Sequence, residues 1–230
     1  SRYELLSWIT QSPNLSITKS QSMDKNNYQP ETNAIRIRTP QTPQMENASP
    51  LFLTSSFCYE DAETMRAVFA DEAEANIYSR FSNPSVDEFS NRMCALEGAE
   101  AGYATASGMS AIFGSFMALL RSGDHLLSSA SIFGSTHTII AKYLPRWNIE
   151  YSYFDINKLE EIESLIRANT KMIFLETPSN PGLDIIDLEK VSAVAKKHKC
   201  RGNGDKCFAT PALQQPIKFG ADIVTHCASK

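Results

Sequence analysis

The sequence predicts an α/β fold in which a mostly parallel sheet is covered by helices on both faces. From about residue 84 onward, short apolar runs alternate with segments of helical periodicity. The runs have the length of buried strands, and the helical segments are long enough to connect parallel neighbours. With 230 residues, the chain can form one large domain, with or without an arm.

Residues 1–50 are expected to form an N-terminal extension and arm. They are rich in Ser, Thr, Gln, Asn and Pro and show little periodicity, which is typical of disordered segments or of arms that lie across a partner subunit. Met23 has the character of a natural start, so residues 1–22 are interpreted either as a non-native addition or as an extension. Residues 51–230 are expected to form the large domain.

The expected elements can be placed in order along the chain. A first helix begins at Pro84 behind the cap Asn83 and ends at Gly98, and a second begins at Ser107 with apolar residues at spacings of three and four. The remaining expected elements are strands at 103–106, 125–130, 149–154 and 171–176, helices at 135–144, 158–168 and 187–199, and a strand pattern from residue 221.

Residues 201–206 do not fit this pattern. A strand is expected after the helix that ends near residue 199, but the chain reads Arg-Gly-Asn-Gly-Asp-Lys. Two glycines and several polar residues make a poor central strand. The segment is therefore expected to be an edge or a loop, or else a damaged part of the sequence.

Composition excludes several function classes. The net charge of −4 with mixed signs disfavours a nucleic-acid surface, and no apolar run is long enough to span a membrane. The N-terminus lacks the features of a secretion signal. Five scattered cysteines without a CxxC pair disfavour a disulfide framework and a structural zinc, and no metal site is expected. Reduced thiols fit a soluble, cytoplasmic protein.

Two segments carry residues suited to binding an anion and an aldehyde. Ser107-Gly108-Met109 lies at a helix start, where backbone N–H groups attract anions; the alternative is an ordinary turn. Lys230 follows the last strand pattern, at the edge where α/β folds bind ligands. A desolvated amine there would be a nucleophile, whereas most lysines are simply solvated.

Three further segments complete a pattern. Asp205 follows residues 201–204 and could keep a heteroaromatic nitrogen protonated, and Asn180 lies in the rigid loop Glu176–Pro181. Tyr78 and Arg80 precede the first helix, where a guanidinium could grip phosphate. Taken singly, each feature can also be explained without a site, as a solvated aspartate, a simple turn or a surface arginine. Together with Lys230 they match the needs of pyridoxal phosphate.

The chain resembles the Cys/Met-metabolism family of pyridoxal-phosphate enzymes, which have the fold-type-I architecture. The resemblance extends from about Glu31 to the final residue. Its most specific runs are Asn76–Pro84, Ala106–Ile112, Glu176–Pro181, Phe208–Pro216 and Gly220–Lys230.

The resemblance implies a role for each candidate. Lys230 would link to the cofactor and move protons, Asp205 would pair with the pyridine nitrogen, and Asn180 would contact the ring oxygen with Glu176 nearby. Ser107, Gly108, Met109 and Ser229 would bind the phosphate. Tyr78 and Arg80 would reach the phosphate of a neighbouring subunit, so the resemblance implies a homodimer or homotetramer with shared active sites.

Three residues depart from the family pattern. Phe133 stands where many members stack a tyrosine on the cofactor; it can stack but cannot act as an acid, and its run resembles the O-succinylhomoserine sulfhydrylase branch. Cys227 replaces a phosphate-binding serine and is a weaker donor. Lys206 replaces the usual asparagine after Asp205. The last two changes are interpreted as damage.

The resemblance implies γ-replacement on an activated homoserine, such as O-succinylhomoserine, with sulfide or a thiol, in methionine and cysteine biosynthesis by trans-sulfuration; cystathionine γ-synthase is a related member. The alternatives are γ-elimination, as in cystathionine and methionine γ-lyases, and an inactive chain that only folds and dimerises. Family members continue beyond the lysine into a small C-terminal domain. We therefore expect an N-terminal fragment with little activity alone.

Overall fold

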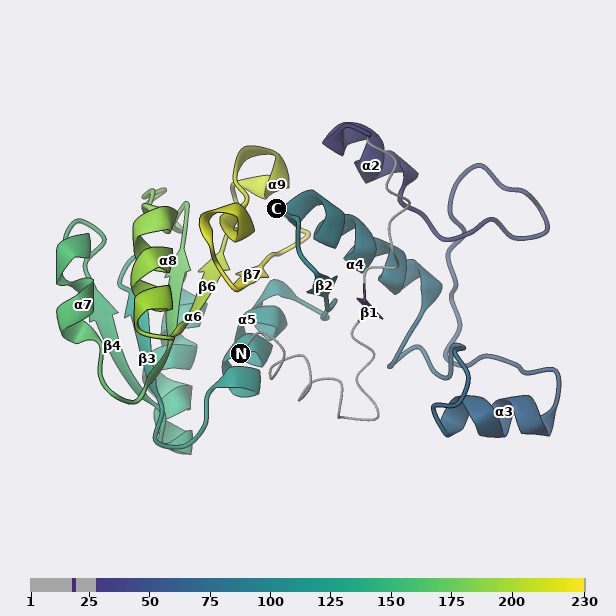
Figure 1. Ribbon diagram of the computed structural model, residues 1–230, viewed down its shortest axis with the longest axis horizontal. Helices are drawn as coiled ribbons and strands as arrows, with labels where there is room; N and C mark the ends of the chain where they lie inside the picture. The colour runs from purple at the N-terminus through teal and green to yellow at the C-terminus, as the bar shows by residue number, and fades with distance from the viewer. Residues whose placement is uncertain (1–17, 20–27, 230) are drawn as a thin grey trace. The chain divides into compact units, whose positions relative to one another are not determined.

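The computed structural model describes residues 18–19 and 28–229 and divides the chain into two compact units, residues 1–104 and 105–230 (Figure 1). Residues 1–17, 20–27 and Lys230 lie outside the described residues. The interpretations of residues 1–22 as an addition or an extension therefore stay predictions. The predicted boundary between residues 50 and 51 also stays a prediction.

The first unit is mainly helical. It contains α2 (Pro30–Arg36), α3 (Ala62–Phe69) and α4 (Pro84–Glu97), and β1 (Thr18–Lys19) pairs antiparallel with β2 (Ala101–Gly102). The predicted cap of α4 is confirmed, because the Asn83 side chain accepts from the Ser85 N–H and Gly98 ends the helix with a φ of 69°. Helix α2 lies inside the predicted arm, and the Thr39 N–H behind it donates to Glu88 of α4 at 2.6 Å.

The strand predicted at residues 103–106 is wrong. Strand β2 ends at Gly102, and Tyr103 is 57% exposed. The Thr105 hydroxyl donates to the Ser107 carbonyl at 2.7 Å, so this stretch belongs to the start of the next helix and not to a sheet.

The second unit contains the predicted parallel sheet. Its strands are β3 (His125–Ser129), β4 (Glu150–Phe154), β5 (Thr170–Glu176), β6 (Arg201–Asp205) and β7 (Ile223–Thr225). They are ordered β4-β3-β5-β6-β7, and all neighbouring pairs are parallel. Strands β3, β4 and β5 match predicted strands to within one residue at each end, and β7 lies inside the strand pattern predicted from residue 221.

Helices cover both faces of this sheet, as predicted (Figure 1). Helix α5 (Gly108–Leu119) and α6 (Gly134–Thr138) pack on one face, and α7 (Ile162–Leu165) and α8 (Leu188–Lys197) pack on the other. Successive strand residues alternate between the two cores: Leu126 and Phe174 face α5, whereas Leu127 and Ile173 face α8.

Two predicted helices are less regular than expected. Helix α6 continues as a π turn over Ile139–Tyr143 and a 3-10 turn over Leu144–Trp147, and α7 is preceded by a 3-10 turn over Leu159–Glu161. After β6, the chain forms the short α9 (Thr210–Leu213) and a 3-10 turn over Pro216–Phe219.

The interpretation of residues 201–206 as an edge or a loop is wrong. Strand β6 is an interior strand that pairs with β5 on one side and with β7 on the other. A Cβ would make only ordinary contacts at both glycines, 4.0 Å from Ala195 of α8 at Gly202 and 3.6 Å from Pro216 at Gly204. The strand is therefore held by its backbone pairing on both sides, although its residues have low strand propensity. That the segment is damaged stays a hypothesis.

Candidate active site

The carboxyl ends of β5, β6 and β7 lie side by side at one edge of the sheet. Glu176 at the end of β5 pairs with Asp205 at the end of β6, and Asp205 pairs with Thr225 at the end of β7. Ligands of open parallel sheets bind outside this edge. The parallel register therefore places two predicted site residues, Glu176 and Asp205, next to each other.

Asp205 is a buried carboxyl with its own hydrogen-bond partners. Its side chain is 2% exposed and accepts from the Thr225 hydroxyl at 3.0 Å and from the Cys207 thiol at 3.6 Å. Burial raises the pKa of Asp205, and these hydrogen bonds oppose that rise only in part. A cationic partner at this edge of the sheet would therefore stabilise the ionised form of Asp205.

Glu176 is also buried and joins two loops. It is 1% exposed; its Oε2 accepts from the Phe133 backbone N–H at 2.5 Å, and the Asn180 backbone N–H hydrogen-bonds the same carboxylate. Burial, with a further contribution from the charge of Asp205, raises the pKa of Glu176 to about 7. The structure thus brings Phe133, Glu176, Asn180 and Asp205 together, while the Phe133 ring stays 38% exposed.

The start of α5 lies against the segment that follows β7. The Ser107 side chain caps the helix by accepting from the Ser110 N–H at 3.1 Å. A Cβ on Gly108 would lie 2.8 Å from the Cys227 Cβ and 3.2 Å from the His226 carbonyl oxygen, so only glycine fits. The first backbone N–H groups of a helix have no hydrogen-bond partner within the helix, so they can bind an anion. Because Gly108 has no side chain, an anion can approach these groups closely.

The hydroxyl of Ser229 lies at the same place. Its Oγ is 3.0 Å from the Cys227 Sγ. Ser107, Gly108, Met109, Cys227 and Ser229 therefore form one cluster of small polar groups and backbone donors, while the Met109 side chain packs on the core beside α5. This cluster fits a phosphate, and the neighbouring Asp205 fits a ring nitrogen, so the residues present suit pyridoxal phosphate.

Three predicted site residues are not brought into this site, and the roles of all the site residues stay predictions. Lys230 lies outside the described residues. Tyr78 and Arg80 belong to the first unit, where the Arg80 guanidinium lies 4.4 Å from the centre of the Tyr78 ring. Their roles stay predictions.

Sequence reasoning missed the two groups that hydrogen-bond Asp205. Thr225 lies opposite Asp205 in the β6–β7 pairing, which the sequence does not give, and Cys207 lies two residues beyond Asp205 in the turn after β6. Lys206, noted only as a departure from the family pattern, is fully buried, and its Nζ donates to the Gln214 carbonyl.

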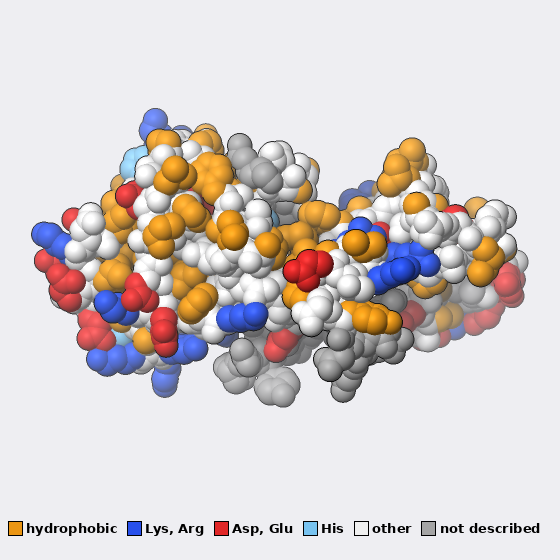
Figure 2. Space-filling model, turned by 90° about the horizontal axis from the view of Figure 1, so that it is seen from above, with side chains coloured by type: hydrophobic (Ala, Val, Ile, Leu, Met, Phe, Trp, Pro, Cys, Tyr) orange, Lys and Arg blue, Asp and Glu red, His pale blue; other side chains and the backbone are white. Residues whose placement is uncertain are grey.

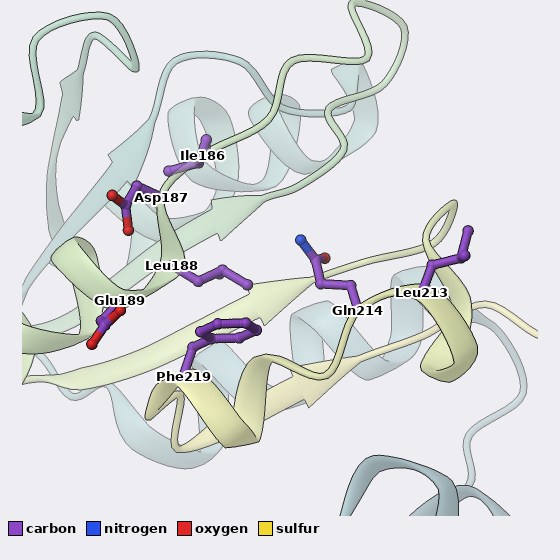
Figure 3. Close-up of a pocket in the computed structure, with 7 residues that line it drawn as sticks. All are labelled: Ile186, Asp187, Leu188, Glu189, Leu213, Gln214 and Phe219. Atoms are coloured by element: carbon purple, nitrogen blue, oxygen red, sulfur yellow. The ribbon is translucent and has the colours of Figure 1, made fainter. Parts of the chain in front are cut away.

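An open pocket of about 320 Å³ lies elsewhere on the second unit (Figure 3). It is lined by Ile186, Asp187, Leu188, Glu189, Leu213, Gln214 and Phe219. None of the predicted site residues lines it. Within the described part of the chain, no group of side chains is suited to hold a metal ion.

Comparison with known protein families matches residues 31–230 to the Cys/Met metabolism PLP-dependent enzymes. The chain belongs to this family. The match covers both described units from α2 onward and includes every predicted site residue, which confirms the resemblance drawn from the sequence motifs.

Individual relatives agree with the family. The chain is 44% identical over 200 residues to the O-succinylhomoserine sulfhydrylase of Pseudomonas aeruginosa, covering 87% of this chain and 50% of the relative. It is 39% identical over 184 residues to the L-methionine gamma-lyase of Fusobacterium nucleatum subsp. nucleatum, covering 80% of this chain and 47% of that protein.

A solved structure supports the fold. A Campylobacter jejuni protein described as an O-acetylhomoserine (thiol)-lyase, which contains N'-pyridoxyl-lysine-5'-monophosphate, superposes with a TM-score of 0.84 at 38% identity. The superposition covers 89% of this chain and 50% of that one. The chain thus spans about half the length of the relatives it matches.

Two further observations concern the helices of the chain and the charges on its surface. None of the helices in residues 28–229 is both long and apolar enough to cross a membrane. On the face shown in Figure 2, acidic and basic side chains are intermixed. The observed charge distribution agrees with the mixed-sign composition of the sequence.

Proposed function

We propose that the protein carries out pyridoxal-phosphate-dependent γ-replacement on an activated homoserine, O-succinylhomoserine or a similar ester, with sulfide or a thiol as the second substrate. The observation that carries this proposal is the buried Asp205 beside the cluster formed by the start of α5 and Cys227. The 44% identity to an O-succinylhomoserine sulfhydrylase supports the choice of substrate.

The site has two parts, which we name by the portion of the cofactor each would hold. The phosphate end consists of Ser107, Gly108, Met109, Cys227 and Ser229. The ring end consists of Phe133, Glu176, Asn180 and Asp205. When bound, the cofactor withdraws electrons from the amino-acid substrate and so acidifies its Cα–H bond.

The residues of this chain would hold the cofactor and shield it from water. Asp205 would keep a proton on the ring nitrogen, because an ion pair there offsets the cost of burying its charge. Phe133 would cover one face of the ring and exclude water. Lys230 would attach the cofactor and carry protons at Cα and Cβ, since the phenyl group of Phe133 has no hydroxyl for that task.

The proposed assembly is a homodimer or homotetramer, in which Tyr78 and Arg80 of one subunit reach the phosphate of another. The cytoplasm is the proposed location. None of the five cysteines, all of which lie in the described residues, forms a disulfide, and this supports a reducing compartment.

A γ-elimination lyase is the second candidate. The 39% identity to an L-methionine gamma-lyase favours it, and it would use the same residues. An inert chain that only folds and dimerises is the third reading.

A product assay separates the candidates. The full-length protein that contains this chain is loaded with pyridoxal phosphate and given O-succinylhomoserine with and without sulfide. Replacement yields homocysteine and succinate only when sulfide is present; elimination yields 2-oxobutyrate, ammonia and succinate without it. We expect homocysteine as the main product, and none from Lys230→Ala. Loaded protein that forms neither set of products contradicts the proposed function and supports the inert reading.

A further inference from the structure

The Glu176 carboxylate connects two loops that reach the site from different strands. Phe133 lies four residues beyond β3, just before α6, and Asn180 lies four residues beyond β5. Both direct their backbone N–H groups to the Glu176 side chain, with the Phe133 nitrogen 2.5 Å from Oε2. A carboxylate is an acceptor with two oxygens, so it can serve both donors at once.

We propose that Glu176 is a positioning residue for the cofactor: its carboxylate holds Phe133 and Asn180 at the spacing that the ring end requires. This inference rests on the proposed function. Glu176 is suited to the task because it is the last residue of a buried strand and pairs directly with Asp205. A group fixed on the sheet thereby sets the place of two residues that lie on loops.

A purely structural anchor would be served by any hydrogen-bond acceptor. The surroundings of Glu176 favour a positioning role over a purely structural one. Burying a carboxylate beside Asp205 costs free energy, and burial raises the pKa of Glu176 to about 7. The titratable groups that face it are Asp205 and Cys207, both from the end of β6. Segments 130–136 and 177–181 contain no titratable side chain, and Lys230 lies outside the described residues.

The first test needs no cofactor. In ¹⁵N–¹H spectra of the cofactor-free protein between about pH 5 and pH 9, the amide protons of Phe133 and Asn180 should shift together with a midpoint near 7. In Glu176→Gln, neither amide should show this transition. Two amides that move independently, or do not move, overturn the shared anchor and with it the inference.

The second test measures the dissociation constant of pyridoxal phosphate. Glu176→Gln keeps one oxygen but places an NH₂ group against an N–H donor, so we expect binding about tenfold weaker and a reduced visible circular dichroism of the bound cofactor. The matched control is Asp184→Asn, the same change of charge in the same loop. Asp184 bonds Ser179 and not Phe133, so its variant should bind within about twofold of the wild type.

The outcomes distinguish the two proposals. If the wild type binds pyridoxal phosphate and Glu176→Gln binds it equally well, the positioning role is overturned while the proposed function stands. If the wild type does not bind the cofactor, the proposed function is overturned and the positioning role with it. Equal weakening in Asp184→Asn and Glu176→Gln would assign the effect to the loop in general and also overturn the inference.

Discussion

At the phosphate end of the site the chain offers backbone N–H groups and small side chains, whereas at the ring end it offers two buried carboxyls. The phosphate end is defined by steric fit, since Gly108 has no room for a Cβ against Cys227. The ring end is defined by charge, since burial raises the pKa of both Glu176 and Asp205. Substitutions that change charge but not volume should therefore act at one end, and those that change volume at the other.

The largest expected effect is at the ring end. Asp205→Asn keeps the volume and an acceptor for the Thr225 hydroxyl but removes the charge that would hold a proton on the ring nitrogen. We expect product formation to fall roughly 100- to 1,000-fold, the usual loss when a buried group that stabilises developing charge is removed. The measurement is the rate of homocysteine formation by the full-length protein at saturating cofactor.

Asp222→Asn is the control for that variant. Asp222 accepts from the Gly202 N–H at 2.9 Å, near the start of β6 and thus at the opposite end of the same strand. It should leave the rate within about twofold of the wild type. Equal rates for Asp205→Asn and the wild type would show that the ring end does not work through this charge.

The second-largest expected effect is a loss of stability with rising pH, which we expect from the buried carboxyls of the ring end. Glu176 has a pKa of about 7 in the folded protein against an ordinary value of 4.5, so the folded state binds its proton more tightly than the unfolded state. Its contribution to stability is therefore complete below pH 4.5 and is lost as the pH rises to 7. The expected loss is on the order of 3 kcal/mol in the free energy of unfolding.

Urea unfolding of the cofactor-free protein at pH 4.5 and pH 7 measures this loss. Other carboxyls of the chain, such as that of Asp61, have lowered pKa values and act in the opposite sense. The informative quantity is thus the difference between the wild type and Glu176→Gln. If both proteins change equally with pH, Glu176 is not the titrating group.

At the phosphate end, volume should matter more than charge. In Gly108→Ala the new Cβ would lie 2.8 Å from the Cys227 Cβ and 3.3 Å from its Cα, so the helix start or the segment after β7 must move. Overpacking of this kind costs about 1–3 kcal/mol, and we expect cofactor binding to weaken at least about tenfold. Fluorescence titration with pyridoxal phosphate and thermal unfolding measure the two quantities.

Gly114→Ala tests the same change in the same helix. No atom lies within 4 Å of a Cβ at Gly114, so this variant should bind the cofactor normally and gain about 0.5–1 kcal/mol from the better helix former. If both variants bind equally well, the close approach at Gly108 does not define the phosphate end.

The two ends also differ in how well the sequence predicts them. Ser107, Gly108 and Met109 are adjacent in the chain, and the onset of the helical period at Ser107 locates them, although the strand predicted just before it is wrong. The contact between Phe133 and Glu176 joins residues 43 positions apart, and nothing in either local sequence indicates it. Contacts between loops depend on which strands are neighbours, and the sequence pattern does not give the strand order.

Strand β6 shows the same limit at the level of the fold. The strands β3 and β5 could be predicted because each contains a buried apolar run, Leu126–Leu127 in β3 and Met172–Leu175 in β5. Most residues of β6 are buried as well, but its place is set by backbone pairing with β5 on one side and β7 on the other. Those determinants lie in its neighbours, so a scale of strand propensity misjudges it.

The smallest expected effect concerns the donor that the phosphate end offers. A thiol is a weaker hydrogen-bond donor than a hydroxyl, so Cys227→Ser should bind pyridoxal phosphate more tightly, by about two- to fivefold. The control is Cys58→Ser, which changes an exposed thiol of the first unit and should have no effect. Weaker binding by Cys227→Ser would mean that the larger sulfur is needed to pack against Gly108, and that fit outweighs hydrogen bonding at this end. Tighter binding would show that the cysteine weakens a site whose shape already suits the phosphate.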